Sequence, residues 1–448
     1  MNLLLNPIRE NGLASPYGAV LFACSVFLLA WLFPPNVYTA YLGEPDRMFL
    51  DLLTLIYFSL CVAAFLLGLR VNRMANPASW HAALPQAESL SPVLYIGVPF
   101  LAASTFCGIC ILKIGAHVNL LMILAAHQGQ SIKSMGRAGE QLSEGIWVWG
   151  PIVLTGVLWW MYLRVQQLRL SRGTRVLFMI AWFFGVCLGI TASLATLSRP
   201  ELLSLIAGCG LLFLFYREAR GRLRIGRGVL YGLAGFSLLA VVFLTISFLR
   251  GASASSLLIS SLFGYSIASY NRLASLVNGS MAYFFGGRGI YLFYYLQDAS
   301  TLDKIFHYQE ILHWPSFELL FGSEFSSVAI AGLNSQYIWS GVFGYLFADL
   351  GWFAPIYVFL AGIFTGYVWS KFRKGAAMAV VCYPWIAVWI LFWNGSNILF
   401  NGSFVHLVYL GILLAGWDRL FLSTRSVPAE SVQVPVAIHE MPMFHAGQ

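Results

Sequence analysis

Residues 250–349 contain the side chains that best combine phosphate binding with acid–base chemistry. This segment alternates apolar and polar residues between two long hydrophobic runs. An arginine can grip a phosphate through a fork of N–H donors without a metal ion, and a carboxylate or imidazole can act as a general base. We therefore interpret the segment as the functional site. Its candidate residues are Arg250, Arg272, Arg288, His307, Glu310, His313 and Asp349.

Three arginines have sequence surroundings that favour an anion. Arg199 follows Ser198 at the predicted start of a helix, where unpaired N–H groups and the helix dipole attract negative charge. Ser198 and Glu201 have the spacing of a capping box, so Glu201 is interpreted as structural. Arg250 closes a hydrophobic run, and Arg288 lies among glycines that let a ligand approach the backbone. The alternatives are contact with lipid headgroups for Arg199 and Arg250, and a solvated turn for Arg288.

The candidate bases each have a structural alternative. Asp349 opens an apolar run, so it is expected first to cap the amino terminus of that helix. His307, Glu310 and His313 recur at steps of three, which places them on a predicted short helix, where they could equally be solvated. Their spacing matches no standard zinc motif, and we expect neither a metal nor a cofactor. His406, in the last hydrophobic run, is a candidate because ionisable groups inside membranes are costly.

The composition is that of a membrane protein. The chain has 448 residues, of which 59% are hydrophobic and 10% charged, and its mean hydropathy is +0.75. Soluble proteins are about 25% charged. Apolar runs of roughly 20 residues can each cross a ~30 Å hydrocarbon core as a helix. The seven cysteines lie in these runs and are expected to pack as small hydrophobes. We attribute the net charge of +8 to loop residues that set orientation, and expect no binding to nucleic acid.

The hydrophobic runs predict a polytopic, all-α protein with about ten membrane-spanning helices. Residues 1–422 would form a single transmembrane domain, and 423–448 a disordered cytoplasmic tail. The loops on the predicted inner side hold 17 of the 26 lysines and arginines, which indicates that both termini are cytoplasmic. Residues 250–349 would then lie on the outer side of the membrane. The ten segments lie at about 17–34, 48–69, 93–115, 146–163, 176–196, 199–216, 228–249, 350–370, 377–394 and 402–422.

A helical stripe occurs early in the segment 250–349. Apolar residues at 259, 263, 267, 270, 274 and 277 recur at steps of four and three. Serine and asparagine residues occupy the other side. The pattern predicts an amphipathic helix on the outer membrane surface. The alternative is an eleventh membrane span.

Residues 334–352 resemble a segment of a known family. The run from Asn334 through Asp349 to Trp352, with Gly362 and Gly366 in the following span, is similar to the N…Y-x-D-x-G…G segment of bacterial oligosaccharide repeat unit polymerases, the O-antigen polymerase family. Arg199 lies in a run similar to the family's Ser-Arg segment, and its spacing to Gly210 is similar to the Arg-x10-Gly pattern described for such enzymes. The resemblance covers roughly residues 175–375.

The resemblance implies a GT-C-like, metal-independent glycosyltransferase in the bacterial inner membrane with its site facing the periplasm. It would transfer a glycan from undecaprenyl pyrophosphate to the sugar end of another lipid-linked repeat. Membrane lipids and a chain-length regulator protein are the further partners to expect. The alternatives are an O-antigen ligase and a lipid-linked oligosaccharide flippase. The catalytic candidates are Asp349, Glu310 and His307, and the substrate-binding candidates are Arg199, Arg250, Arg288, Arg272, Asn334 and Tyr337.

Overall fold

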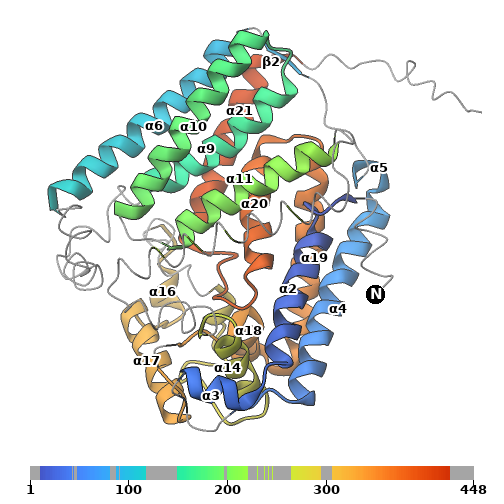
Figure 1. Ribbon diagram of the computed structural model, residues 1–448, viewed down its shortest axis with the longest axis vertical. Helices are drawn as coiled ribbons and strands as arrows, with labels where there is room; N and C mark the ends of the chain where they lie inside the picture. Colours follow the sequence, from blue (N-terminus) through green and yellow to red (C-terminus); the bar gives the residue numbers. More distant parts are fainter. Residues whose placement is uncertain are drawn as a thin grey trace, which may run out of the picture.

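The chain folds almost entirely into helices (Figure 1). The computed structural model describes residues 11–42, 44, 48–80, 87–89, 91–117, 149–195, 199–219, 264–293, 305–335 and 337–423, with single positions at 230, 237, 241 and 245. The elements are α2 (Pro16–Trp31), α3 (Pro35–Leu42), α4 (Leu52–Ala75), α5 (Pro77–Trp80), β1 (Glu88–Ser89), α6 (Pro92–His117), α9 (Trp149–Gln167), α10 (Arg172–Ala195), α11 (Arg199–Ala219), α14 (Ile267–Val277), η2 (Tyr291–Phe293), α16 (Tyr308–Ile311), α17 (Phe317–Ile330), α18 (Gly341–Leu350), η4 (Gly351–Phe353), α19 (Ala354–Arg373), α20 (Ala377–Leu391), α21 (Gly402–Phe421) and β2 (Leu422–Ser423).

Nine of the ten predicted segments coincide with helices. The seventh, 228–249, lies almost wholly outside the described residues, so the count of about ten stays a prediction. Six candidate spans in the described part of the chain are long and apolar enough to cross a membrane. The protein is therefore membrane-embedded and helical. The first residue of the predicted tail, Ser423, belongs to the short strand β2, which pairs with β1. Residues 424–448 lie outside the described residues.

The loops gather at two opposite ends of the molecule. At one end, the Glu218 carboxylate accepts hydrogen bonds from the backbone of Leu13 and Ala14, and β1 pairs with β2. Arg164 reaches the carbonyl of Gly375 at the same end. All of these segments belong to the predicted inner side. Three of the predicted outer segments, which contain Glu44, Arg272 and Asn394, meet around α3, α14 and α18 at the other end (Figure 1). The predicted outer segments after α6 and α10 lie outside the described residues.

Two parallel helices, α4 and α19, touch through their backbones. A side chain at Gly362 would meet the carbonyl oxygen of Phe65 at 2.3 Å, and one at Gly68 would meet that of Phe359 at 2.2 Å. Small residues allow such close approach between membrane helices. Gly362 belongs to the resemblance described above, and its role in this fold is helix packing.

Helices α9 and α20 are almost wholly buried. In α20, thirteen of the fifteen residues are buried, including Trp385 and Trp389. A helix that is apolar on all sides belongs in a core. All seven cysteines are free, and Cys107 and Cys110 are buried, as their apolar surroundings predict.

The prediction of an amphipathic helix on the membrane surface is wrong for the part of this segment that the structure describes. Every residue of α14 is buried, and α14 packs against α2, α4 and α18. Three of its polar residues, Asn271, Arg272 and Ser275, hydrogen-bond inside the protein. The periodicity predicted the helix correctly. However, polar residues that are paired in a core give the same sequence periodicity as polar residues that face water. Positions 259 and 263 lie outside the described residues.

Candidate functional site

The structure brings the glycine loop around Arg288 against Asp349. Asp349 lies near the end of α18, and its Oδ2 accepts hydrogen bonds from the backbone N–H of Tyr291 at 2.6 Å and of Leu292 at 3.0 Å. The N–H of Gly287 donates to the carbonyl of Ala348 at 3.0 Å. Two features that are 58 positions apart in sequence therefore form one structural unit.

This geometry corrects the expectation that Asp349 caps the following helix. Asp349 is inside α18, whose cap is Ser340, and it binds the first N–H groups of η2 instead. Gly351 then ends α18 at a φ of 54°, a left-handed conformation that suits glycine. The second carboxylate oxygen of Asp349, Oδ1, is buried and has no hydrogen-bond partner among the described residues.

The loop that carries Arg288 is tight on one side and open on the other. A side chain at Gly286 would meet the carbonyl oxygen of Ala348 at 2.7 Å, so only glycine allows this approach. Gly287 and Gly289 take positive φ values, 79° and 73°, and have open space around them. Arg288 between them is exposed, and its guanidinium lies 5.5 Å from the ring centre of Phe285. The guanidinium is therefore presented to the surroundings.

Polar contacts from α19, α20 and the link between α20 and α21 hold this unit in place. The amide of Asn397, in the link between α20 and α21, donates to the carbonyls of Tyr291 and Leu292. Its oxygen accepts from the indole N–H of Trp389 at 3.1 Å, and Tyr357 of α19 donates to the Leu292 carbonyl at 3.3 Å. The loop is thus tied to helices on several sides.

Behind the loop lies a buried cluster of tyrosines with a carboxylate. The rings of Tyr283 and Tyr291 pack on Tyr345, with centroids 5.8 and 5.7 Å away. The hydroxyl of Tyr345 donates to Glu324 of α17, which is fully buried. Burial first, and then the negative charge of Glu324, raises the pKa of Tyr291, so its phenol stays protonated. Sequence reasoning missed Glu324, although an ionisable residue inside an apolar helix was a signal for it.

Arg272 belongs to a different, fully buried network. It forms an ion pair with Glu44, and neither side chain is exposed. Its Nε donates to the carbonyl of Tyr337 at 2.5 Å, and its other nitrogens donate to Glu44, Tyr38 and the carbonyls of Ala268 and Asn334. All five N–H groups of a guanidinium can be assigned to these acceptors. Arg272 therefore keeps no donor for a phosphate in this arrangement.

Asn334 and Tyr38, which neighbour Arg272 in this network, are engaged as well. The N–H of Asn334 donates to Glu44 at 3.0 Å, and its side chain donates to the Leu42 carbonyl at 3.0 Å. Tyr38 donates to Glu44 at 2.5 Å, and burial raises the pKa of its phenol. Arg272, Asn334 and Tyr337 thus hold the segment after α3 to α14, rather than lining the Arg288 loop.

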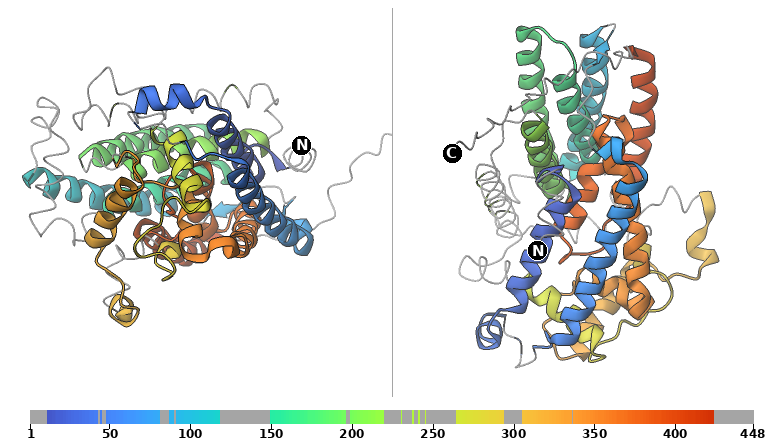
Figure 2. Two further views of the ribbon diagram at one scale, coloured as in Figure 1. Left: turned by 90° about the horizontal axis from the view of Figure 1, so that it is seen from below. Right: turned by 90° about the vertical axis from the view of Figure 1, so that its right-hand side faces the viewer.

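The histidine and glutamate candidates do not lie on one helix, contrary to the expectation. Helix α16 covers only Tyr308–Ile311, and His307 and His313 flank it with left-handed φ values of 48° and 50°. His307, Glu310 and His313 are all exposed. Both views in Figure 2 show α16 standing out from the rest of the molecule. The structure therefore does not bring these residues to Asp349. Among the described residues, no group of three or more His, Cys, Asp or Glu side chains could hold a metal ion.

The remaining candidates are only partly described. Arg199 is the first residue of α11, at the opposite end of that helix from Glu218. Its side chain, like Ser198 and Arg250, lies outside the described part of the structure. Glu201 is buried in the first turn of α11. His406 of α21 packs on Trp149, with ring centroids 4.0 Å apart.

Comparison with known proteins found no match for this chain. No protein-family model, no curated protein and no solved structure is similar to it. The function is therefore argued below from the residues and their geometry.

Proposed function

We propose that this protein is a polymerase of lipid-linked oligosaccharide repeat units. A hydroxyl of the acceptor sugar attacks the anomeric carbon of the donor glycan. The new glycosidic bond forms as the bond from that carbon to the pyrophosphate oxygen breaks. A base takes the hydroxyl proton, and undecaprenyl pyrophosphate leaves with the bonding electrons.

The observation that carries this proposal is the contact between the exposed Arg288 loop and Asp349, at the end of the molecule opposite the basic loops. Positive residues favour the cytoplasmic side of a bacterial inner membrane. The proposed orientation therefore places the Arg288 loop at the periplasmic side, where lipid-linked repeats would be joined.

In this mechanism the arginines neutralise the leaving group. Arg288 contacts the pyrophosphate from its open loop, and Arg199 and Arg250, whose side chains lie outside the described residues, stay predicted donor-binding residues. Donors that are already in place stabilise developing charge without reorganising. This assignment leaves out Arg272 and Asn334, because their polar groups are engaged inside the protein, and Tyr337, whose backbone carbonyl accepts from Arg272.

Asp349 is the proposed base. Its Oδ2 is held by two N–H groups, and its Oδ1 is the oxygen that would take the proton. Oδ1 is buried, and the open space at Gly287 and Gly289, beside Asp349, is where the acceptor would approach it. His307 and Glu310 are weaker candidates for this role because they lie on the protruding segment around α16.

Exposed aromatic side chains around the loop can stack on sugar rings. Phe284 is 59% exposed, Trp352 47% and Phe353 72%, and the last two lie in η4 directly after Asp349 and Leu350. Such surfaces with a few polar groups are typical of binding sites for organic ligands.

The lipopolysaccharide of a deletion strain tests the proposal. A polymerase mutant should attach one repeat unit to the lipid A core, and expression of the intact protein should restore the ladder. Absence of any repeat on the core would contradict the proposal and indicate a ligase or a flippase.

A further inference from the structure

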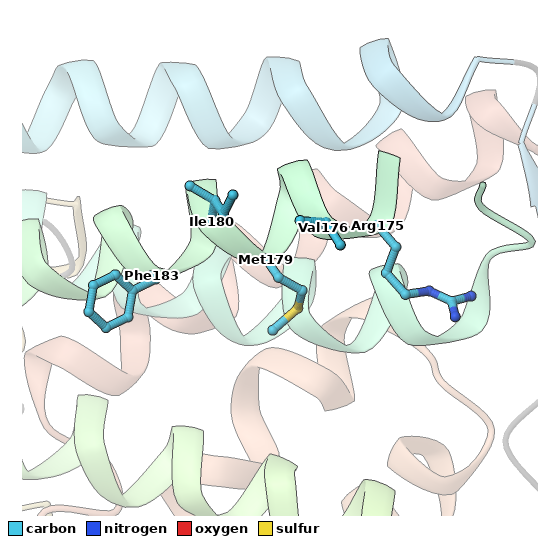
Figure 3. Close-up of a pocket in the computed structure, with 5 residues that line it drawn as sticks. All are labelled: Arg175, Val176, Met179, Ile180 and Phe183. Carbon is cyan, nitrogen blue, oxygen red and sulfur yellow. The ribbon is translucent and has the colours of Figure 1, made fainter. Parts of the chain in front are cut away.

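A second candidate site lies on α10, away from the Arg288 loop. Figure 3 shows Val176, Met179, Ile180 and Phe183 along this helix, with the Arg175 guanidinium at one end of the row. These five residues line an open groove of about 410 Å³. Positions three and four apart share a helix face, so the groove follows the helix axis.

The charge at this end of α10 is not balanced by nearby carboxylates. The first turn of α10 contains no acidic residue. Arg164 and Arg169, earlier in the chain, pair with Asp418 and Glu88. Within the described residues Arg175 forms no such ion pair, and its Nε is buried without a hydrogen-bond partner. Arg175 can therefore accept an anionic partner.

The apolar part of the groove lies within a membrane-spanning helix. Val176 is 52% exposed, Ile180 50% and Phe183 60%, and α10 is one of the six candidate spans. At 1.5 Å per residue, the distance along the helix from Arg175 to Phe183 is about 12 Å. This length suits several methylene groups of an acyl chain.

We propose that this groove binds one anionic phospholipid. The headgroup phosphate pairs with Arg175, and an acyl chain lies along Val176, Met179, Ile180 and Phe183. Charge complementarity at one end and exposed apolar side chains along the rest match a molecule with an anionic head and a hydrocarbon tail. The site does not depend on the proposed polymerase activity.

Native mass spectrometry of the purified protein tests the site, with phosphatidylglycerol and phosphatidylethanolamine of equal chain length as probes. The intact protein should retain phosphatidylglycerol preferentially. Arg175→Ala and Arg175→Gln should each reduce that retention about fivefold, the effect of one basic residue near an anionic surface. Met179→Trp should reduce retention of both lipids by filling the groove.

Arg419→Ala is the control, because Arg419 is an exposed arginine at the basic end, in the last turn of α21, whereas Arg175 is half-buried. It should leave retention unchanged. Equal retention of the two lipids by the intact protein would overturn the proposal, as would normal retention by both Arg175 variants. Disulfide cross-linking between two copies through Ile180→Cys would also overturn it, by assigning the face to a dimer.

Discussion

Arg272 and Arg288 carry the same charge in the same segment, but their surroundings give them different roles. Arg272 is fully buried and paired with Glu44, whereas Arg288 is exposed on a glycine loop. A buried guanidinium whose donors are engaged holds a fold together, and an exposed one can bind a ligand. Replacing Arg288 should therefore lower activity, whereas replacing Arg272 should lower stability.

Arg288→Ala should shorten the polymer without lowering the amount of protein. Loss of one preorganised donor to a developing charge costs ~10²–10³ in rate. Arg288→Lys should recover part of the activity, because lysine keeps the charge but cannot form the bidentate hydrogen bonds of a guanidinium. Polymer length is measured at matched protein levels, with Arg419→Ala as the control. A normal ladder from Arg288→Ala would refute the role in donor binding.

Arg272→Ala should instead destabilise the protein. Removing one partner of a buried ion pair costs about 3–5 kcal/mol, because the other charge stays buried and unpaired. Glu44→Ala should act similarly, and the double replacement of Arg272 and Glu44 by methionine should be less harmful than either single change. Thermal unfolding in detergent measures this. Full stability of Arg272→Ala would show that the ion pair is not needed.

Asp349→Asn separates the two roles of this carboxylate. The amide oxygen can still accept from Tyr291 and Leu292, so the loop should keep its shape, but the side chain can no longer take a proton. We expect normal protein levels and a loss of polymerisation. Activity close to normal would leave Asp349 as a positioning residue for the Arg288 loop.

At the scale of the helices, glycine decides how closely α4 and α19 pack. Gly362 faces the backbone of Phe65, whereas nothing lies within 4 Å of a side chain added at Gly210 of α11. Both glycines belong to the sequence resemblance. Only Gly362 has a packing role that the described residues reveal.

Gly362→Ala should therefore destabilise the protein, by about 1–3 kcal/mol, the usual cost of overpacking. Gly210→Ala is the matched control and should be tolerated. The fraction of monodisperse protein after mild heating distinguishes the two variants. Equal behaviour would contradict the close α4–α19 contact.

At the scale of the whole molecule, the two groups of loops predict sidedness. Ser280 is exposed near the Arg288 loop, and Ser171 is exposed between α9 and α10 at the basic end. In intact cells, a membrane-impermeant maleimide should label Ser280→Cys but not Ser171→Cys, with the unmodified protein as background. Labelling of Ser171→Cys alone would reverse the proposed orientation.

The sequence alone determined the class of protein and the position of most helices. Hydropathy and helical periodicity are local properties, so a run of apolar residues is sufficient to predict α4 or α19. The charge pattern also predicted which of the described loops group together. The segment 228–249 stays a prediction, because it lies almost wholly outside the described residues.

Only the tertiary structure decided which polar residues share a site. Arg272 pairs with Glu44 across 228 positions, and Asp349 binds the backbone of Tyr291 across 58. No local pattern distinguishes a polar residue that faces water from one that is paired in a core, as α14 illustrates. Burial and hydrogen bonding depend on contacts between distant segments, and these contacts separated the exposed Arg288 from the buried Arg272.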